Sequence, residues 1–544
     1  MPTILSLVFV LSGAAGLIYE SIWTRYLGLF VGHGAYAQII VLTIFLGGMS
    51  IGAFVVGKLS ERLRDPLATY AFIELAIGII GFAFHDIFVA VTNASYDHIF
   101  PSLAGSPHIV VVVKWTIAAL LILPQSILLG ATFPLMSAGV LRIVPRHPGK
   151  VLAELYFANS LGGAVGVLLA GFWLLAAGGL PLTLVAAAAV NFVVFIIALG
   201  AARFGSRAAT AQEAPESEPV GDTPASAERM TDSLARLLLI VAFGTAVASF
   251  IYEISWIRML SLLLGSATHS FELMLSAFIL GLALGARWVR SRADRFADPV
   301  RALGVVQCAM GLAALATIPL YLASFGWAAS FISALKITDG GYDLFTVARY
   351  VACLVVMLPS TFCAGMTLPL ITRMLMRRGD GERAIGIVYA SNTLGSIVGV
   401  VLAGLVLLPL VGLKVLLVSG AAVDMALGVV LLRVSGASTQ RGMRLVYRAA
   451  FVMAAATIAS LALNHFDQIV LSSGVYRYGT LPDPRGRHID FYRDGRTATV
   501  AVGHTDPEGF TWIATNGKPD ASVDRAWFSP RDTTKRERGS SNTR

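Results

Sequence analysis

The chain has 544 residues, of which 56% are hydrophobic and only 13% are charged. Soluble domains carry about 25% charged residues, so this composition excludes an ordinary soluble protein and predicts a surface that faces lipid. The net charge of +9 is typical of basic membrane-protein loops rather than of a nucleic-acid-binding surface, and the three cysteines form neither a disulfide framework nor a metal motif.

Apolar stretches of membrane-spanning length follow one another along most of the chain. A helix needs about 20 apolar residues to cross a bilayer. We therefore expect helices at 3–21, 37–57, 67–92, 109–140, 152–176, 180–202, 235–256, 271–289, 302–323, 344–372, 385–409 and 412–432.

The rest of the chain lies between and after these helices. Residues 449–463 are apolar but short for a crossing, and predict either a thirteenth helix or an interfacial one. Runs at 497–502 and 510–515, with turn residues between them, predict a small β-hairpin. The expected organisation is a first six-helix repeat (1–203), a disordered cytoplasmic linker (204–233), a second six-helix repeat (234–434), a possible thirteenth helix (435–465), a partial β region (466–525) and a disordered tail (526–544).

The two sets of six helices are copies of one unit. Residues 18–53 align with residues 251–286 without a gap, and the similarity resumes between 123–135 and 358–370. Because six crossings return the chain to its starting side, the copies share one orientation and form a parallel repeat. We expect an all-α polytopic membrane bundle with 6+6 helices. Lysine and arginine concentrate on the N-terminal side of this bundle, which predicts a cytoplasmic N-terminus.

Each copy carries a carboxylate and an arginine near the end of its first helix. These are Glu20 with Arg25, and Glu253 with Arg258, the four candidate substrate-binding residues of the sequence. Ionisable groups within a membrane are costly and are candidates for function, so a glutamate from each half could bind a cationic substrate near the pseudo-symmetry axis. The alternative is an interfacial cluster of Glu, Trp and Arg that anchors each helix at the lipid head groups.

Small residues four positions apart recur in both copies and predict close helix contacts. Asparagines beside them could form hydrogen bonds between helices. The residues expected to serve packing are Gly48, Gly52, Gly281, Gly285, Asn159, Asn392, Gly162, Gly166, Gly395 and Gly399.

Four more charged residues lie inside apolar stretches and find no identical partner in the other copy. Each could line a polar cavity, and Glu74 with Lys114 could form a buried ion pair. The four are Glu74, Lys114, Arg349 and Asp424.

Several short passages resemble the bacterial membrane proteins in which a major-facilitator-like bundle is fused to a spermidine synthase domain. The passages are residues 12–25, 127–135, 156–166, 472–479, 491–502 and 516–522. The resemblance implies a multi-pass protein of the bacterial inner membrane. It also implies an activity, the transfer of an aminopropyl group from decarboxylated S-adenosylmethionine to putrescine.

The family's nucleotide-binding sheet and catalytic aspartate would lie beyond residue 525, where only a polar tail follows. We therefore expect a catalytically incomplete member, and whether the chain is an enzyme stays open. No catalytic residue, metal or cofactor is assigned. The alternatives are a transporter of a small cation or metabolite such as a polyamine, and a membrane scaffold. The expected partner is the lipid bilayer and not nucleic acid; the oligomeric state stays open.

Overall fold

The computed structural model describes most of the chain between Pro2 and Asp524. The residues outside this description are 1, 33, 104, 144–147, 211–230, 266–268, 293–294, 336–337, 378–382, 437–438, 507–508 and 525–544.

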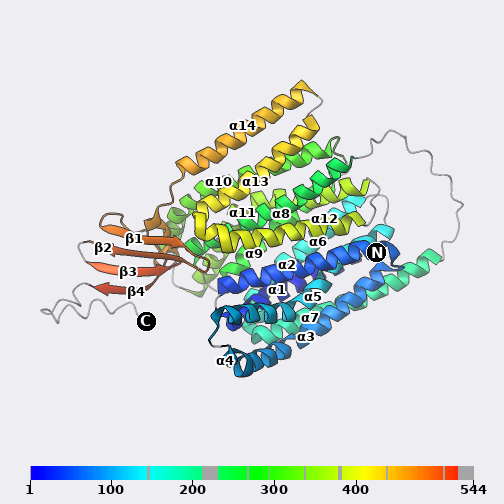
Figure 1. Ribbon diagram of the computed structural model, residues 1–544, viewed down its shortest axis with the longest axis horizontal. Coiled ribbons are helices and arrows are strands. Elements are labelled where there is room, and N and C mark those ends of the chain that lie inside the picture. Colours follow the sequence, from blue (N-terminus) through cyan, green and yellow to red (C-terminus); the bar gives the residue numbers. More distant parts are fainter. Residues whose placement is uncertain are drawn as a thin grey trace.

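The first half of the molecule is a bundle of long helices (Figure 1). Asp65 begins one of them by accepting hydrogen bonds from the backbone N–H groups of Leu67 and Ala68 at 3.0 and 2.9 Å, with a proline at the first helical position. The long helices are α1 (Pro2–Val31), α2 (Gly34–Leu59), α3 (Pro66–Ala94), α5 (Pro107–Ile143), α6 (Pro148–Leu169) and α7 (Leu175–Thr210), and the short ones are η1 (Ser60–Arg62), η2 (Ser95–Ile99), α4 (Phe100–Ser102) and η3 (Ala170–Leu174).

The second half repeats this plan. Asp298 begins α10 as Asp65 begins α3, by accepting a hydrogen bond from the N–H of Arg301 at 2.9 Å. The helices of this half are α8 (Asp232–Leu264), α9 (Ser270–Arg290), α10 (Pro299–Ala334), α11 (Asp339–Leu375), α12 (Arg383–Val401), η5 (Leu402–Leu407) and α13 (Leu408–Gly436), and α14 (Gln440–Leu463) follows.

A glycine turn divides the longest helical run in each half. Gly179 and Gly412 lie 233 residues apart and adopt positive φ angles of 67° and 75°, which a residue without Cβ tolerates best. A π-helical segment, η3 or η5, precedes each turn. The runs 148–203 and 383–436 are therefore each two crossing segments joined by a tight turn.

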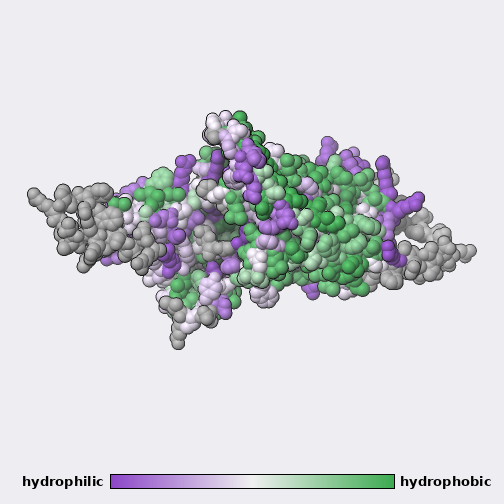
Figure 2. Space-filling model, turned by 90° about the horizontal axis from the view of Figure 1, so that it is seen from below, coloured by the Kyte–Doolittle hydropathy of each residue, from purple (hydrophilic) through white to green (hydrophobic). Residues whose placement is uncertain are grey.

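Eleven helices of the described residues, these two runs included, are long and apolar enough to cross a membrane. Figure 2 shows their hydrophobic side chains as a broad green belt with hydrophilic residues toward the two ends. This confirms the expected class, an all-α membrane bundle. Helix α14 is longer than the apolar run at 449–463, because it begins at Gln440 and includes the arginine-rich residues before that run.

The edges of the expected linker differ from the prediction. Helix α7 continues to Thr210 and α8 begins at Asp232, so residues 204–210 and 232–233 are helical. The rest of the linker, except Thr231 at the N-cap of α8, and the expected tail at 526–544 lie outside the described residues.

A small antiparallel sheet packs against one end of the bundle, which we call the sheet end (Figure 1). The N-terminus lies at the opposite end, which we call the N-terminal end. The strands follow one another in the order β1-β2-β3-β4. They are β1 (Arg487–Asp494), β2 (Thr499–Thr505), β3 (Phe510–Thr515) and β4 (Lys518–Asp524), after the short helices α15 (Gln468–Leu471) and α16 (Val475–Tyr478). The sheet has two more strands than the expected hairpin.

Candidate functional site

A cavity of about 180 Å³ lies where the two halves meet. Helices α1, α2 and α6 of the first half and α8, α9, α11 and α12 of the second half contribute to its wall. This is room for a small solute with several water molecules. The lining residues are Leu17, Glu20, Leu42, Leu46, Met49, Tyr156, Thr245, Ala246, Ser249, Phe250, Glu253, Leu275, Phe278, Ile279, Leu282, Ala364, Thr367, Leu368, Tyr389, Asn392, Thr393 and Ser396.

The two glutamates singled out by the repeat both line this cavity. Glu20 comes from α1 and Glu253 from the equivalent position of α8, and they lie close enough for their charges to interact. Both side chains are buried, at 5% and 3% exposure. Neither forms a side-chain hydrogen bond or ion pair with another described residue. The cavity thus receives one unpaired carboxyl group from each half.

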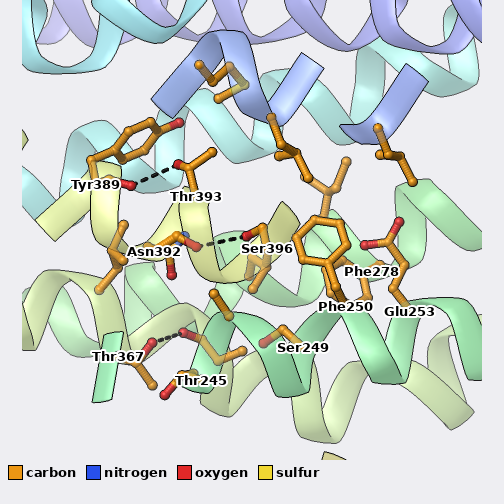
Figure 3. Close-up of a pocket in the computed structure, with 18 of the residues that line it drawn as sticks. Thr245, Ser249, Phe250, Glu253, Phe278, Thr367, Tyr389, Asn392, Thr393 and Ser396 are labelled. Atoms are coloured by element: carbon orange, nitrogen blue, oxygen red, sulfur yellow. Dashed lines mark hydrogen bonds between the residues drawn. The ribbon is translucent and has the colours of Figure 1, made fainter. Parts of the chain in front are cut away.

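Hydroxyl groups on α11 and α12 add to the acceptor character of the wall (Figure 3). Thr393 and Ser396 donate their hydroxyl protons to the carbonyls of Tyr389 and Asn392 at 2.8 and 3.0 Å, and Thr367 donates to Ala364 at 2.7 Å. A hydroxyl has one proton and two lone pairs. With the proton used inside the helix, each hydroxyl offers only lone pairs to a ligand.

Thr245, Ser249 and Asn392 are further polar residues of the wall, and the rest of it is aromatic or aliphatic. In Figure 3, Glu253 lies on one side of the cavity, next to Phe250 and Phe278, and Tyr389 lies on the other. No lysine, arginine or histidine is among the described lining residues. A cavity with two carboxyl groups, lone pairs and aromatic faces favours a ligand that carries positive charge and N–H donors.

The arginine beside Glu20 does not line the cavity. Arg25 instead forms an ion pair with Glu272 at the first turn of α9, and Glu272 is 1% exposed. The pair therefore joins the first half to the second at the sheet end. At the other end of α9, Arg290 pairs with Glu154 of α6 at 2.7 Å. We call these two contacts the sheet-end latch and the N-terminal latch; the cavity lies between them.

The second arginine of the repeat holds the C-terminal sheet. Arg258 donates hydrogen bonds to the carbonyls of Thr497 at 2.8 Å and Gly495 at 3.1 Å, both in the turn between β1 and β2. The same turn contacts the bundle through Arg496, whose Nε donates to the carbonyl of Leu405 at 3.1 Å. Equivalent arginines thus have different partners, and neither lines the cavity.

Further contacts hold this turn in place. The carboxylate of Asp494 accepts hydrogen bonds from the N–H of Leu413 at 3.3 Å and from the hydroxyl of Thr499 at 2.8 Å. Burial, and then the charge of Asp494, raise the pKa of the Tyr492 phenol above its ordinary value, so this phenol stays neutral beside the turn.

The alternative of a head-group anchor does not agree with the tryptophans. Trp23 and Trp256 are both 0% exposed, and Trp256 donates a hydrogen bond to the hydroxyl of Thr317 at 3.1 Å. Interfacial tryptophans place one edge in water, whereas these two fill the interior of their halves.

Sequence reasoning missed a buried polar cluster in the first half. Ser12 donates to Oε1 of Glu74 at 2.5 Å, and Asn191 donates to Oε2 at 2.6 Å. Tyr19 donates to the side-chain oxygen of Asn191 at 2.9 Å. Lys114 is not the partner of Glu74, as the sequence suggested; its ammonium lies over aromatic rings 5.5 to 6.0 Å away.

The second half holds the equivalent cluster at positions displaced by 233 residues. Tyr252 donates to Oδ2 of Asp424 at 2.7 Å, and Gln307 donates to the hydroxyl of Thr245. The acid has changed places with the amide: Glu74 corresponds to Gln307, and Asn191 to Asp424. Applying the repeat offset to similar rather than identical residues reveals this exchange in the sequence.

The glycines expected to serve packing lie at helix contacts. A Cβ on Gly52 would overlap the carbonyl oxygen of Ile127 on α5, and one on Gly285 would overlap that of Phe362 on α11. Gly48 and Gly281 lie at the same two contacts, α2 with α5 and α9 with α11. The other pairs place α6 against α1 and α12 against α8; their residues are Gly162, Gly166, Gly395 and Gly399. Asn159 lies against Gly13, whereas Asn392 faces the central cavity.

No metal site was predicted from the sequence, but three side chains with metal-ligand atoms meet on the sheet. His488, His504 and Asp506 place one such atom each within 4.8 Å of one another. Nδ1 of His504 is also 2.9 Å from the carboxylate of Asp490. All of these side chains are at least partly exposed.

Comparison with known proteins corrects the family resemblance. No family model matches the chain, and no curated protein matches it. The solved structures that match include the human organic anion transporter MFSD10 (TETRAN), which is 14% identical with a TM-score of 0.49 and covers 79% of this chain and 98% of its own. That likeness is too weak to carry an argument about substrate or mechanism. The expected membership of the spermidine synthase family is wrong, because no comparison supports it.

Proposed function

We propose that this chain is a secondary transporter of a small organic cation, with Glu20 and Glu253 as the groups that bind it. The observation that carries the proposal is the position of these carboxyl groups: one from each half, buried in one cavity, without a basic partner among the described residues. Buried carboxyl groups are costly unless a partner compensates them. A cationic substrate is such a partner.

The chemistry of the cavity narrows the substrate to amines. An ammonium group donates three hydrogen bonds, and the wall offers two carboxyl groups together with the lone pairs of Thr367, Thr393 and Ser396. Two carboxyl groups suit two ammonium groups, so a short diamine is the best-matched probe. The aromatic faces of Phe250 and Phe278 add cation–π attraction.

The two latches suggest how the site is exposed to each side in turn. When the halves rock apart at the sheet end, the ion pair between Arg25 and Glu272 opens while that between Glu154 and Arg290 holds. Rocking in the other direction reverses this. Rocking of two repeats about a central site is a common transport mechanism. By the charge of its loops, the N-terminal end faces the cytoplasm.

Binding of putrescine by the detergent-solubilised protein tests the proposal. We expect putrescine to raise the unfolding temperature of the parent. Glu20→Gln and Glu253→Gln should each weaken binding by roughly 10- to 150-fold, because a hydrogen bond to a charged group contributes about 1.5–3 kcal/mol. Asp490→Asn removes an exposed carboxylate from the sheet and should leave the response unchanged.

Uptake of labelled putrescine into proteoliposomes then separates binding from transport. The parent should accumulate label, and the two glutamine variants should lose uptake in proportion to affinity. If putrescine neither stabilises the parent nor enters the vesicles, the cation transporter is wrong. Equal shifts for the parent and both glutamine variants would reject the glutamates as the binding groups.

A further inference from the structure

Arg349 of α11 is a buried cation without an anionic partner. Its side chain is 4% exposed. Its Nη2 donates to the hydroxyl of Thr346 at 3.1 Å, and the guanidinium lies 4.7 Å from the ring centroid of Phe345. Its Nε has no hydrogen-bond partner, and no described carboxylate forms an ion pair with it. A charge left this way inside a membrane bundle is costly, so an anion is missing from its surroundings.

The arginine lines a second cavity, of about 290 Å³, distinct from the central one. Helices α8, α10 and α11 form its wall. Among the described lining residues, the only polar side chains besides Arg349 are Trp327 and Ser324, and the hydroxyl of Ser324 donates to the carbonyl of Tyr321 at 2.6 Å. Its apolar wall includes Leu264, Leu320, Phe331, Phe345 and Val356.

The mouth of this cavity opens on the outer face of the bundle. Trp327, Val351 and Val355 line it and are 61%, 50% and 48% exposed. Exposed apolar side chains on a spanning helix face lipid tails. A ligand can therefore enter from the bilayer without crossing water.

In the first half, the residue equivalent to Arg349 is a lysine that lies against aromatic rings. The segments 123–135 and 358–370 align with an offset of 235 residues, which places Lys114 opposite Arg349. The ammonium of Lys114 lies 5.5 to 6.0 Å from the ring centroids of Phe30, Tyr96 and Phe100. Three aromatic faces stabilise that cation, whereas Arg349 has one ring and an open apolar space.

We propose that the cavity binds a fatty acid, with its carboxylate on Arg349 and its acyl chain along the apolar wall. A guanidinium binds a carboxylate through two parallel hydrogen bonds, which would engage the unpaired Nε. The volume lies at the lower end of the range for small-molecule sites. It suits one chain with a small head group better than a two-chain phospholipid.

Quenching of tryptophan fluorescence by a brominated long-chain fatty acid tests the site in the detergent-solubilised chain. The chain has eight tryptophans, and Trp327→Phe identifies the part of the signal that comes from the cavity. We expect saturable quenching in the parent, and a saturation concentration at least about tenfold higher in Arg349→Met. Arg349→Lys should fall between the two, and Lys114→Met should behave as the parent.

The brominated alcohol of the same chain length is the matched probe without charge. It should need at least about tenfold more ligand than the acid in the parent, a comparison that does not depend on any variant folding. Equal quenching by acid and alcohol, or by the parent and Arg349→Met, would overturn the proposal. Displacement of the acid by phosphatidylglycerol at concentrations below those of unlabelled palmitate would also overturn it, in favour of a phospholipid.

Discussion

The two buried polar clusters are equivalent, except that the acid and the amide have exchanged positions between them. Glu74 is the acid of the first cluster and Asp424 is the acid of the second. In the first half the acid is on α3 and the amide, Asn191, is on α7; in the second half the amide, Gln307, is on α10 and the acid is on α13. Each cluster therefore contains one carboxyl group and one amide. In the first cluster both oxygens of Glu74 accept a hydrogen bond without a second buried charge, whereas in the second cluster Oδ1 of Asp424 and Oε1 of Gln307 have no hydrogen-bond partner.

Exchanging the two residues of the first cluster tests this account. Asn191→Asp places two carboxyl groups together, and should destabilise the protein by roughly 3–5 kcal/mol because a buried charge is left uncompensated. Adding Glu74→Gln recreates the arrangement of the second half and should recover most of that loss. Thermal unfolding of both single variants and the double variant measures the coupling. Strictly additive losses would contradict the explanation.

Among the elements, the turn between β1 and β2 carries the contact between the sheet and the bundle. Arg258 binds two of its carbonyls, and Asp494 accepts the N–H of Leu413 directly after the glycine turn of α13. The sheet is therefore fixed to the second half at the sheet end. Its position follows from an arginine that belongs to the repeat.

Removing Arg258 should free the turn between β1 and β2. Arg496 lies in the turn, so trypsin reports its opening. We expect cleavage after Arg496 to be at least about tenfold faster in Arg258→Met, because two hydrogen bonds to a charged donor are lost. Arg25→Met changes the equivalent arginine of the first half and should leave this cleavage rate unchanged. The rate is followed by mass spectrometry of the new terminus; an unchanged rate in Arg258→Met would show that other contacts hold the turn.

For the whole molecule, the repeat predicted more than the motifs did. The helices, the break near Gly179 and the two cavity glutamates follow from periodicity and duplication. The roles of Arg25 and Arg258 did not, because their partners Glu272 and Thr497 lie 247 and 239 residues away in the chain. No local pattern encodes such contacts.

The β region, too, could be predicted only in part from the sequence. The runs at 497–502 and 510–515 correspond to β2 and β3, which carry apolar residues. Strands β1 and β4 consist largely of charged or polar residues. Pairing with neighbouring strands, and not their own composition, makes them strands. The family resemblance failed because its passages are short. Three of them lie in apolar helices, where packing favours the same small residues, and the other three lie in the C-terminal region.

The orientation of the whole molecule in the membrane is open to direct test. The basic loops predict that the N-terminal end faces the cytoplasm. Reporter fusions after Pro215, between the halves, and after Thr338, at the start of α11, should therefore report opposite sides, with the first cytoplasmic. A fusion after Gly105 offers a matched control for Thr338 in the first half. The same side for 215 and 338 would reject this topology.

Both latches use one helix, and this has a mechanical consequence. Glu272 and Arg290 lie at the two ends of α9, about 27 Å apart at 1.5 Å per residue. Their partners belong to α1 and α6, which pack together through Gly162 and Gly166. When the stiff helix α9 tilts against the packed pair α1 and α6, separation at one latch brings the residues of the other latch together. In the proposed transporter, such an arrangement leaves no tilt at which both ends are open, so ions would not leak through while the substrate is exchanged.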